Sequence, residues 1–184
     1  MRMCIVAGLC ALLLISAIPV FADDGEGLAG KSEIMAAAAW AKVTAGSDSG
    51  TLTLAGATYG KFLNSNVEAQ LGIIYAQVTD LPDIGGDIKA TMLTPAVAYH
   101  FLSGEGSSTV PYIGAGAVYA RLTSGGTTET STKAQYFAGV KLFIGGDYTT
   151  ANKAVFLEYR RTNVELEGAN STVDMVWAGI STIF

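Results

Sequence analysis

The segment KAVFLEYRRTNVEL, residues 153–166, decides the fold because its side chains alternate with a period of two. In an extended chain, successive side chains point to opposite faces. One face then carries Val155, Leu157 and Tyr159, and the other carries Glu158 and Arg160. The segment therefore predicts a β-strand with an apolar face and a second face on which opposite charges can neutralise each other.

Seven turn-like stretches rich in Gly, Ser, Asn and Asp divide the chain after residue 31 into eight such segments. The segments are 32–44, 51–62, 67–79, 88–102, 110–122, 132–144, 153–166 and 171–184. Each is longer than the usual strand of about five or six residues and reaches the roughly 9–11 residues of a tilted membrane strand. Eight is also the strand number of the smallest closed transmembrane barrels.

The same alternation assigns faces in other segments. Segment 132–144 places Lys141 on the polar face, segment 67–79 places Glu68 there, and the closing segment places Trp177 there. Segment 51–62 is less decisive, and with Leu52 and Leu54 outward it would point Lys61 inward near Glu68. If the polar faces line a lumen, we expect a charge network of Lys61, Glu68, Lys141, Glu158 and Arg160, because a buried charge must be paired.

The first 22 residues resemble a secretory signal peptide, with Arg2, an apolar run and small residues before a cleavage site after Ala22. Residues 23–31 are Gly-rich and acidic, and we expect a flexible lead-in. Both cysteines lie in the leader, so the exported chain would have no disulfide and no thiol chemistry. We therefore predict three parts: signal peptide 1–22, lead-in 23–31 and barrel 32–184.

Two alternatives stay open. A soluble periplasmic barrel of the lipocalin type would show the same alternation, although export, strand length and the apolar ending at Phe184 favour a membrane barrel. Segment 32–44 contains the run MAAAAWAK, which favours a helix by propensity. We predict a strand there, because seven strands would be an unusual number for a bacterial barrel.

The stretches PYIGAGAVYARL (111–122) and FLEYRR (156–161) and the strand ending in Phe184 resemble the bacterial outer-membrane β-barrel superfamily, specifically its eight-stranded barrels of OmpA/OmpX type. This resemblance implies an all-β, antiparallel, up-and-down transmembrane barrel in the outer membrane. It also implies that periplasmic chaperones and the barrel-assembly machinery act on the chain, and that Gly179 and Phe184 belong to the assembly signal. Thr182 departs from the apolar residue expected at its position.

The candidate partners follow from charge and location. The chain has a net charge of −5 and no basic stripe, which excludes a nucleic-acid function. We expect outer-membrane lipid and lipopolysaccharide as partners, and a monomer. A lipopolysaccharide-facing rim would consist of Lys42, Lys89, Arg121 and Arg161, and their alternative role is that of ordinary solvated charges.

Catalytic and metal sites find little support. A hydrolase acting on lipid A would need His, Ser and an acid together, whereas His100 is the single histidine and Ser103 follows it in a turn. Asp80, Asp83 and Asp87 could hold a weak Ca²⁺ ion, but they fit a solvated acidic loop better. We expect no enzyme activity, no cofactor and no metal.

The function that we predict is therefore a structural or surface-interaction role for a barrel whose lumen is filled by side chains. The main alternative is a narrow pore of low conductance for ions or small solutes, because eight strands leave room for little more than side chains. A lipid A-modifying hydrolase is a less favoured third reading.

Overall fold

The computed structural model describes residues 27–45, 48–79, 88–104, 106–124, 126–166 and 169–184, without the side chains of 40–45, 48–50, 88, 124, 163–166, 169–171 and 173. It contains eight strands. They are β1 (Ser32–Ala45), β2 (Asp48–Phe62), β3 (Val67–Thr79), β4 (Ile88–His100), β5 (Thr109–Ser124), β6 (Thr127–Phe143), β7 (Lys153–Leu166) and β8 (Ala169–Ile183).

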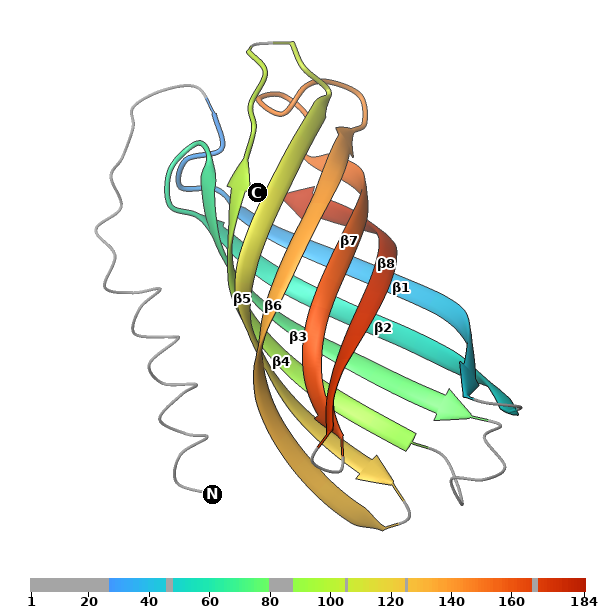
Figure 1. Cartoon of the computed structure of the whole chain (residues 1–184). Coiled ribbons are helices and arrows are strands. Elements are labelled where there is room, and N and C mark those ends of the chain that lie inside the picture. Colours follow the sequence, from blue (N-terminus) through green and yellow to red (C-terminus); the bar gives the residue numbers. More distant parts are fainter. Residues whose placement is uncertain (1–26, 46–47, 80–87, 105, 125, 167–168) are drawn as a thin grey trace.

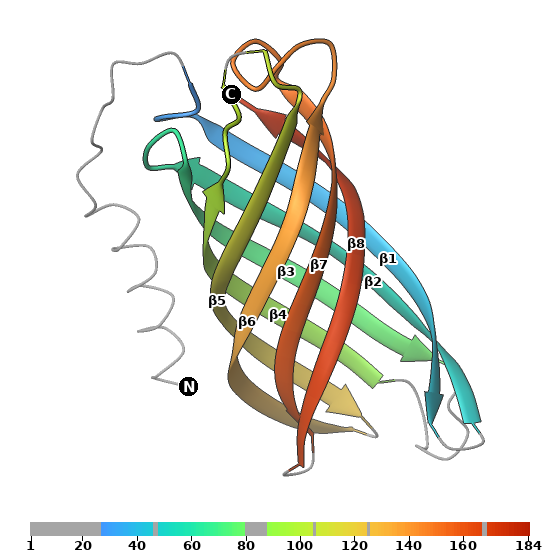
Figure 2. The same ribbon diagram turned by 45° about the horizontal axis from the view of Figure 1, so that its top comes forward.

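Each strand pairs antiparallel with the next, and β8 pairs with β1, so the sheet closes into a barrel (Figure 1). This confirms the predicted eight-stranded antiparallel barrel. Ser32–Ala45 is a strand and not a helix. Both the beginning of β1 and the C-terminus lie at one end of the barrel, which we call the terminal end (Figures 1 and 2).

The turns at the opposite end are shorter than the sequence suggests. Residues 123–131 read as a loop of nine residues, but β5 continues to Ser124 and β6 begins at Thr127. Thr123 pairs with Thr128 in this hairpin. Threonine is β-branched and favours extended backbone, while Gly126 adopts a positive φ of 84° that suits the tight turn.

The outward faces of the strands form a continuous apolar belt. Its most exposed members include Val176, Ile180, Tyr136 and Ile73, each with more than half of its surface accessible. Large apolar side chains are rarely left exposed in this number on a protein surrounded by water. The belt therefore requires an apolar environment outside the barrel.

The lumen is filled by side chains in layers. At the terminal end an apolar plug closes it, consisting of Leu28, Phe62, Val110, Phe143, Tyr148, Ala154 and Ile183. Buried polar and charged residues follow in the middle. The half toward the opposite end is lined by an apolar cluster of Leu54, Ile74, Ala76, Ala90, Met92, Val118, Ala120, Met175 and Trp177.

Part of the expected lead-in belongs to this plug. Leu28 is fully buried, and the backbone N–H of Gly30 donates to the carbonyl of Phe62 at 3.1 Å. Residues 28–31 are thus packed against the barrel and not a free tail. The predicted signal peptide and residues 23–26 lie outside the described residues. No helix among the described residues is long and apolar enough to cross a membrane.

Candidate functional site

The centre of the lumen contains an ionic cluster of Glu33, Glu68, His100 and Lys141, supplied by β1, β3, β4 and β6. Alternation along β6 turns Lys141 inward, where it is 1% exposed. Its ammonium group pairs with Glu33 Oε2 and lies 3.7 Å from Glu68 Oε2. One cation therefore joins two buried carboxylates across the lumen, which compensates part of their desolvation cost.

Glu68 is the acceptor shared by most of this cluster. Its Oε2 atom lies 2.9 Å from His100 Nε2 and accepts a hydrogen bond from Gln70 Nε2 at 2.8 Å. Gly60 makes room for this carboxylate, since a Cβ there would lie 1.6 Å from Glu68 Oε1. The glycine on β2 is thus a steric requirement of the cluster.

Aromatic rings enclose the ammonium group of Lys141. Its Nζ lies 5.3 Å from the ring centroid of Tyr112 and 5.6 Å from that of Phe62. The His100 ring stacks on Tyr112, with centroids 5.4 Å apart. These distances fall within the range of cation–π attraction, which adds to the stabilisation of a desolvated cation.

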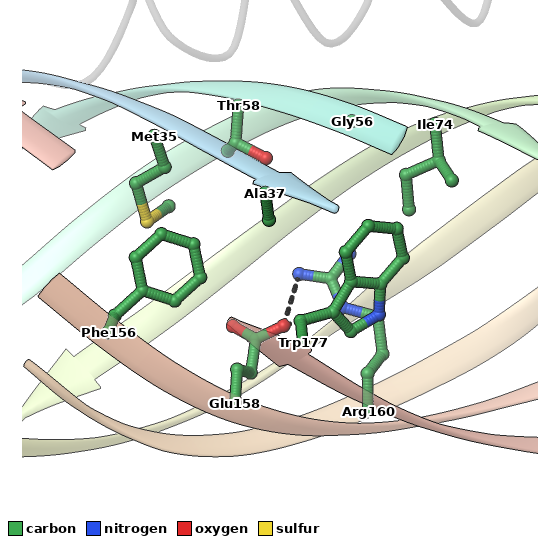
Figure 3. A pocket seen from close by; sticks show the side chains of 9 residues that line it. All are labelled: Met35, Ala37, Gly56, Thr58, Ile74, Phe156, Glu158, Arg160 and Trp177. Atoms are coloured by element: carbon green, nitrogen blue, oxygen red, sulfur yellow. Dashed lines mark hydrogen bonds and ion pairs between the residues drawn. The ribbon is translucent and has the colours of Figure 1, made fainter. Parts of the chain in front are cut away.

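A second cluster, the Arg160 cluster, lies next to the first and consists of Glu158, Arg160, Gln135 and Tyr112. Arg160 Nε donates to Glu158 Oε1 at 2.9 Å, and its Nη1 donates to Gln135 Oε1 at 3.3 Å. Figure 3 shows the ion pair between Glu158 and Arg160. Tyr112 donates to Glu158 Oε2 at 3.0 Å and so links the two clusters.

This arrangement binds and neutralises charge but presents no reactive centre. His100 is fully buried against Glu68, whereas Ser103 is exposed in the loop between β4 and β5. The described residues contain no group of three or more His, Cys, Asp or Glu side chains placed to hold a metal. The acidic loop with Asp80, Asp83 and Asp87 lies outside the described residues.

Four of the five residues predicted for the lumen network face the lumen, and Lys61 does not. Glu68 and Lys141 belong to the ionic cluster, while Glu158 and Arg160 form the second ion pair. Lys61 instead lies at the terminal rim, where its Nζ donates to the carbonyl of Gly30 and lies 3.5 Å from Ser32 Oγ. The inward face of β2 carries the even-numbered residues, including Leu54, so the predicted outward face of Leu54 and inward face of Lys61 are wrong.

The network predicted from the sequence did not include Glu33, Gln135 or His100, which the structure places in the two clusters. Glu33 follows Ser32 at the start of a run of alanines, where neither face is distinctly apolar. It is nevertheless the only charge in the stretch 32–41, and in a membrane strand an ionisable residue is expected to face the interior. That argument would have found it.

Two of the predicted rim residues lie near each other, and a third lies on another part of the barrel. Lys89 and Arg121 are exposed on the adjacent strands β4 and β5, toward the opposite end. Arg161, on β7, is engaged with Asp174 of β8 through bonds of 2.7 and 3.0 Å. The side chain of Lys42 lies outside the described part.

The two residues predicted for the assembly signal both lie where β8 meets β1. Gly179 faces the lumen and pairs with Ala37. The backbone N–H and carbonyl of Phe184 bond to Ser32 at 2.9 and 2.7 Å. Their role in assembly stays a prediction.

At the terminal end, Asp147 organises the loop between β6 and β7. Its Oδ1 atom accepts bonds from the backbone N–H groups of Thr149 and Thr150, both at 2.9 Å, and Oδ2 accepts one from Gly106 at 3.1 Å. The hydroxyls of the two threonines also donate to it. These bonds favour the ionised form and hold the pKa of the Asp147 carboxyl well below its usual range.

Replacing Asp147 by alanine is expected to loosen this loop without unfolding the barrel. Amide hydrogen exchange at Thr149 and Thr150 should become roughly tenfold faster at neutral pH, because both amides lose the carboxylate acceptor and Thr150 keeps only a 3.3 Å bond to the backbone carbonyl of residue 147. Since the pKa is lowered in the folded protein, the wild-type loop should resist acidification until the pH falls below the usual range for aspartate. The variant Asp147→Asn keeps one oxygen acceptor, so its exchange rates at Thr149 and Thr150 should lie between those of wild type and Asp147→Ala. Equal exchange rates in all three proteins would contradict the prediction.

A closed barrel that is apolar outside and has its charges paired inside is a transmembrane β-barrel. The family model of the outer membrane protein beta-barrel domain matches residues 8–184. The chain therefore belongs to this family of outer membrane barrels.

Solved structures of bacterial outer membrane proteins share the fold. The chain is 22% identical to the N-terminal β-barrel domain of OprF from Pseudomonas aeruginosa, with a TM-score of 0.57 over 84% of this chain and 98% of that one. Neisserial surface protein A is 18% identical, with a TM-score of 0.60 over 83% of this chain and 96% of that one. OprG from Pseudomonas aeruginosa is 15% identical, with a TM-score of 0.57 over 86% of this chain and 97% of that one. No protein with a curated description matches the chain by sequence.

Proposed function

We propose that the protein is a non-conducting barrel of the outer membrane with a structural or surface-interaction role. The observation that carries the proposal is the filling of the lumen at the terminal end. There the apolar plug and the ionic cluster follow one another along the barrel, and Phe62, His100 and Lys141 are each at most 1% exposed. An ion crossing this region would have to displace side chains from both layers.

The proposed partners are those expected for such a barrel. Outer-membrane lipid and lipopolysaccharide would surround the apolar belt, after export through a cleaved signal peptide. Periplasmic chaperones and the barrel-assembly machinery would deliver the chain to the membrane. A monomer is consistent with a sheet in which every strand pairs with two neighbours of the same chain.

Planar-bilayer recording of the purified protein tests the proposal. The wild-type barrel is expected to give no stable open level, whereas the variant Phe62→Ala/Tyr112→Ala, which removes two large rings from the plugged half, should conduct. A stable wild-type open level that disappears on neutralising Glu158 or Arg160 would contradict the proposal and support a narrow pore.

A further inference from the structure

The barrel closes through a short seam between β1 and β8. Their ladder runs only from Glu33–Ile183 to Ala38–Ala178, although β1 continues to Ala45 and β8 begins at Ala169. With six residue pairs, this ladder is the shortest of the eight ladders among the described residues. Toward the opposite end β1 and β8 separate, as Figures 1 and 2 both show.

The unpaired part of the seam begins inside the apolar belt. Val176 and Ile180 are among the most exposed apolar side chains on the outer face of β8, and the ladder stops between them at Ala178. Backbone groups that lack a partner are costly in a hydrocarbon environment. This part of the wall therefore favours an occupant that can enter from the lipid.

A cavity lies directly inside the end of this ladder. It is lined by Met35, Ala37, Gly56, Thr58, Ile74, Phe156, Glu158, Arg160 and Trp177. The space is small and partly open to the surroundings, so a short segment of one hydrocarbon chain fits it better than a bulky ligand. Figure 3 shows Met35 beside the Phe156 ring, and Trp177 near Ile74 and Arg160.

The chemistry of the lining indicates the occupant. Two of the lining residues, Ile74 and Trp177, also belong to the apolar cluster of the half toward the opposite end. The indole N–H of Trp177 is buried and has no hydrogen-bond partner among the described residues, and a buried donor without an acceptor is costly. An acyl group satisfies both features, because it combines a hydrocarbon chain with a carbonyl acceptor.

We propose that the outer half of the lumen is an acyl-chain site, which a membrane lipid enters sideways through the seam between β1 and β8 beyond Ala38 and Ala178. The proposal is independent of ion conduction, since the terminal half of the lumen can stay plugged while a chain occupies the other half.

Fluorescence quenching by brominated lipid tests this entry. The sequence has two tryptophans, Trp40 and Trp177, so a variant without Trp40 reports on Trp177 alone. The existing register pairs Ala36 with Ile180, and its continuation would place residue 40 opposite Val176. The variant Trp40→Cys/Val176→Cys therefore removes one tryptophan and allows a disulfide to lock the seam.

In vesicles of phosphatidylcholine brominated at mid-chain, Trp177 of the reduced variant is expected to be strongly quenched. Oxidation should abolish most of that quenching. The matched control Ala36→Cys/Ile180→Cys with Trp40→Phe forms its disulfide within the existing ladder, so its quenching should not change. Absence of quenching in the reduced protein, or equal quenching before and after locking, would overturn the proposal.

A second variant decides the case in which the seam cysteines fail to join. Ala37→Leu with Trp40→Phe fills the cavity from β1 while leaving the ladder in place. It is expected to reduce quenching of Trp177 relative to Trp40→Phe alone. Unchanged quenching would show that bromine outside the barrel quenches Trp177 through the wall, and it would overturn the proposal.

Discussion

Replacing Lys141 by methionine is expected to lower the free energy of unfolding by about 3–5 kcal/mol, the scale found when one partner of a buried ion pair is removed. The substitution preserves the bulk of the side chain but leaves Glu33 and Glu68 without their shared cation. Neither carboxylate can reach water, because both are fully buried. The measurement is urea unfolding in lipid vesicles, in which the folded fraction at each urea concentration is read from heat-modifiable gel migration.

Two variants separate charge from packing at this site. Lys61→Met removes a lysine at the terminal rim and should change the unfolding midpoint little, because exposed ion pairs and rim charges contribute little. Glu33→Gln/Lys141→Met removes an opposite charge together with the cation and should recover part of the lost stability. A single Lys141→Met variant as stable as wild type would show that the ionic cluster does not hold the lumen together.

Replacing Gly179 by valine is expected to prevent the barrel from closing. A Cβ at this position would lie 2.1 Å from the carbonyl oxygen of Ala36 and 2.7 Å from Phe156 Cζ. Overpacking a core usually costs about 1–3 kcal/mol when neighbours can shift, but here the nearest neighbour is backbone of the β1–β8 ladder. We expect almost complete loss of the heat-modifiable folded band.

The neighbouring substitution Ala178→Val is the control, because its side chain lies on the exposed outer face and should be tolerated. Refolding without the assembly machinery distinguishes a steric role of Gly179 from a role as a recognition signal. Normal refolding of Gly179→Val in vitro would contradict the steric argument. Deleting Phe184 should have the reverse signature, with a larger defect in cells than in vitro.

Two of the strands that carry lumen charges, β6 and β7, could be predicted together with the face of each charge. On β6 and β7, Lys141, Glu158 and Arg160 alternate with large apolar residues, so only one assignment keeps the charges out of lipid. All eight strands pair in chain order and close into a barrel, as predicted. A strong difference between the two faces is what made the sequence informative there.

β2 could not be assigned because its two faces differ too little. Thr53, Ala55 and Ala57 face outward, while Leu54 and Gly56 face inward. The usual rule places leucine in lipid, but this half of the lumen is itself apolar. The inward position of Leu54 depends on partners from β3, β4, β5 and β8, which no local pattern reveals.

The clustering of Glu33, Glu68, His100 and Lys141 was equally inaccessible, because it joins residues as far as 108 positions apart. Alternation gives the face of each residue but not its height along the barrel. That height depends on the stagger between neighbouring strands, and the turn lengths that set the stagger were misjudged at residues 123–131.

The outward charges of β7 define the depth of membrane that the protein can match. Lys153 and Arg161 are both exposed on the outer face, and Val155, Leu157 and Tyr159 are the outward residues between them. Eight residue steps span about 27 Å along an extended strand, which a tilt of about 35–45° reduces to about 20 Å. The hydrophobic thickness of the protein therefore matches a thin bilayer of short-chain lipids and is smaller than that of thick, sterol-rich membranes.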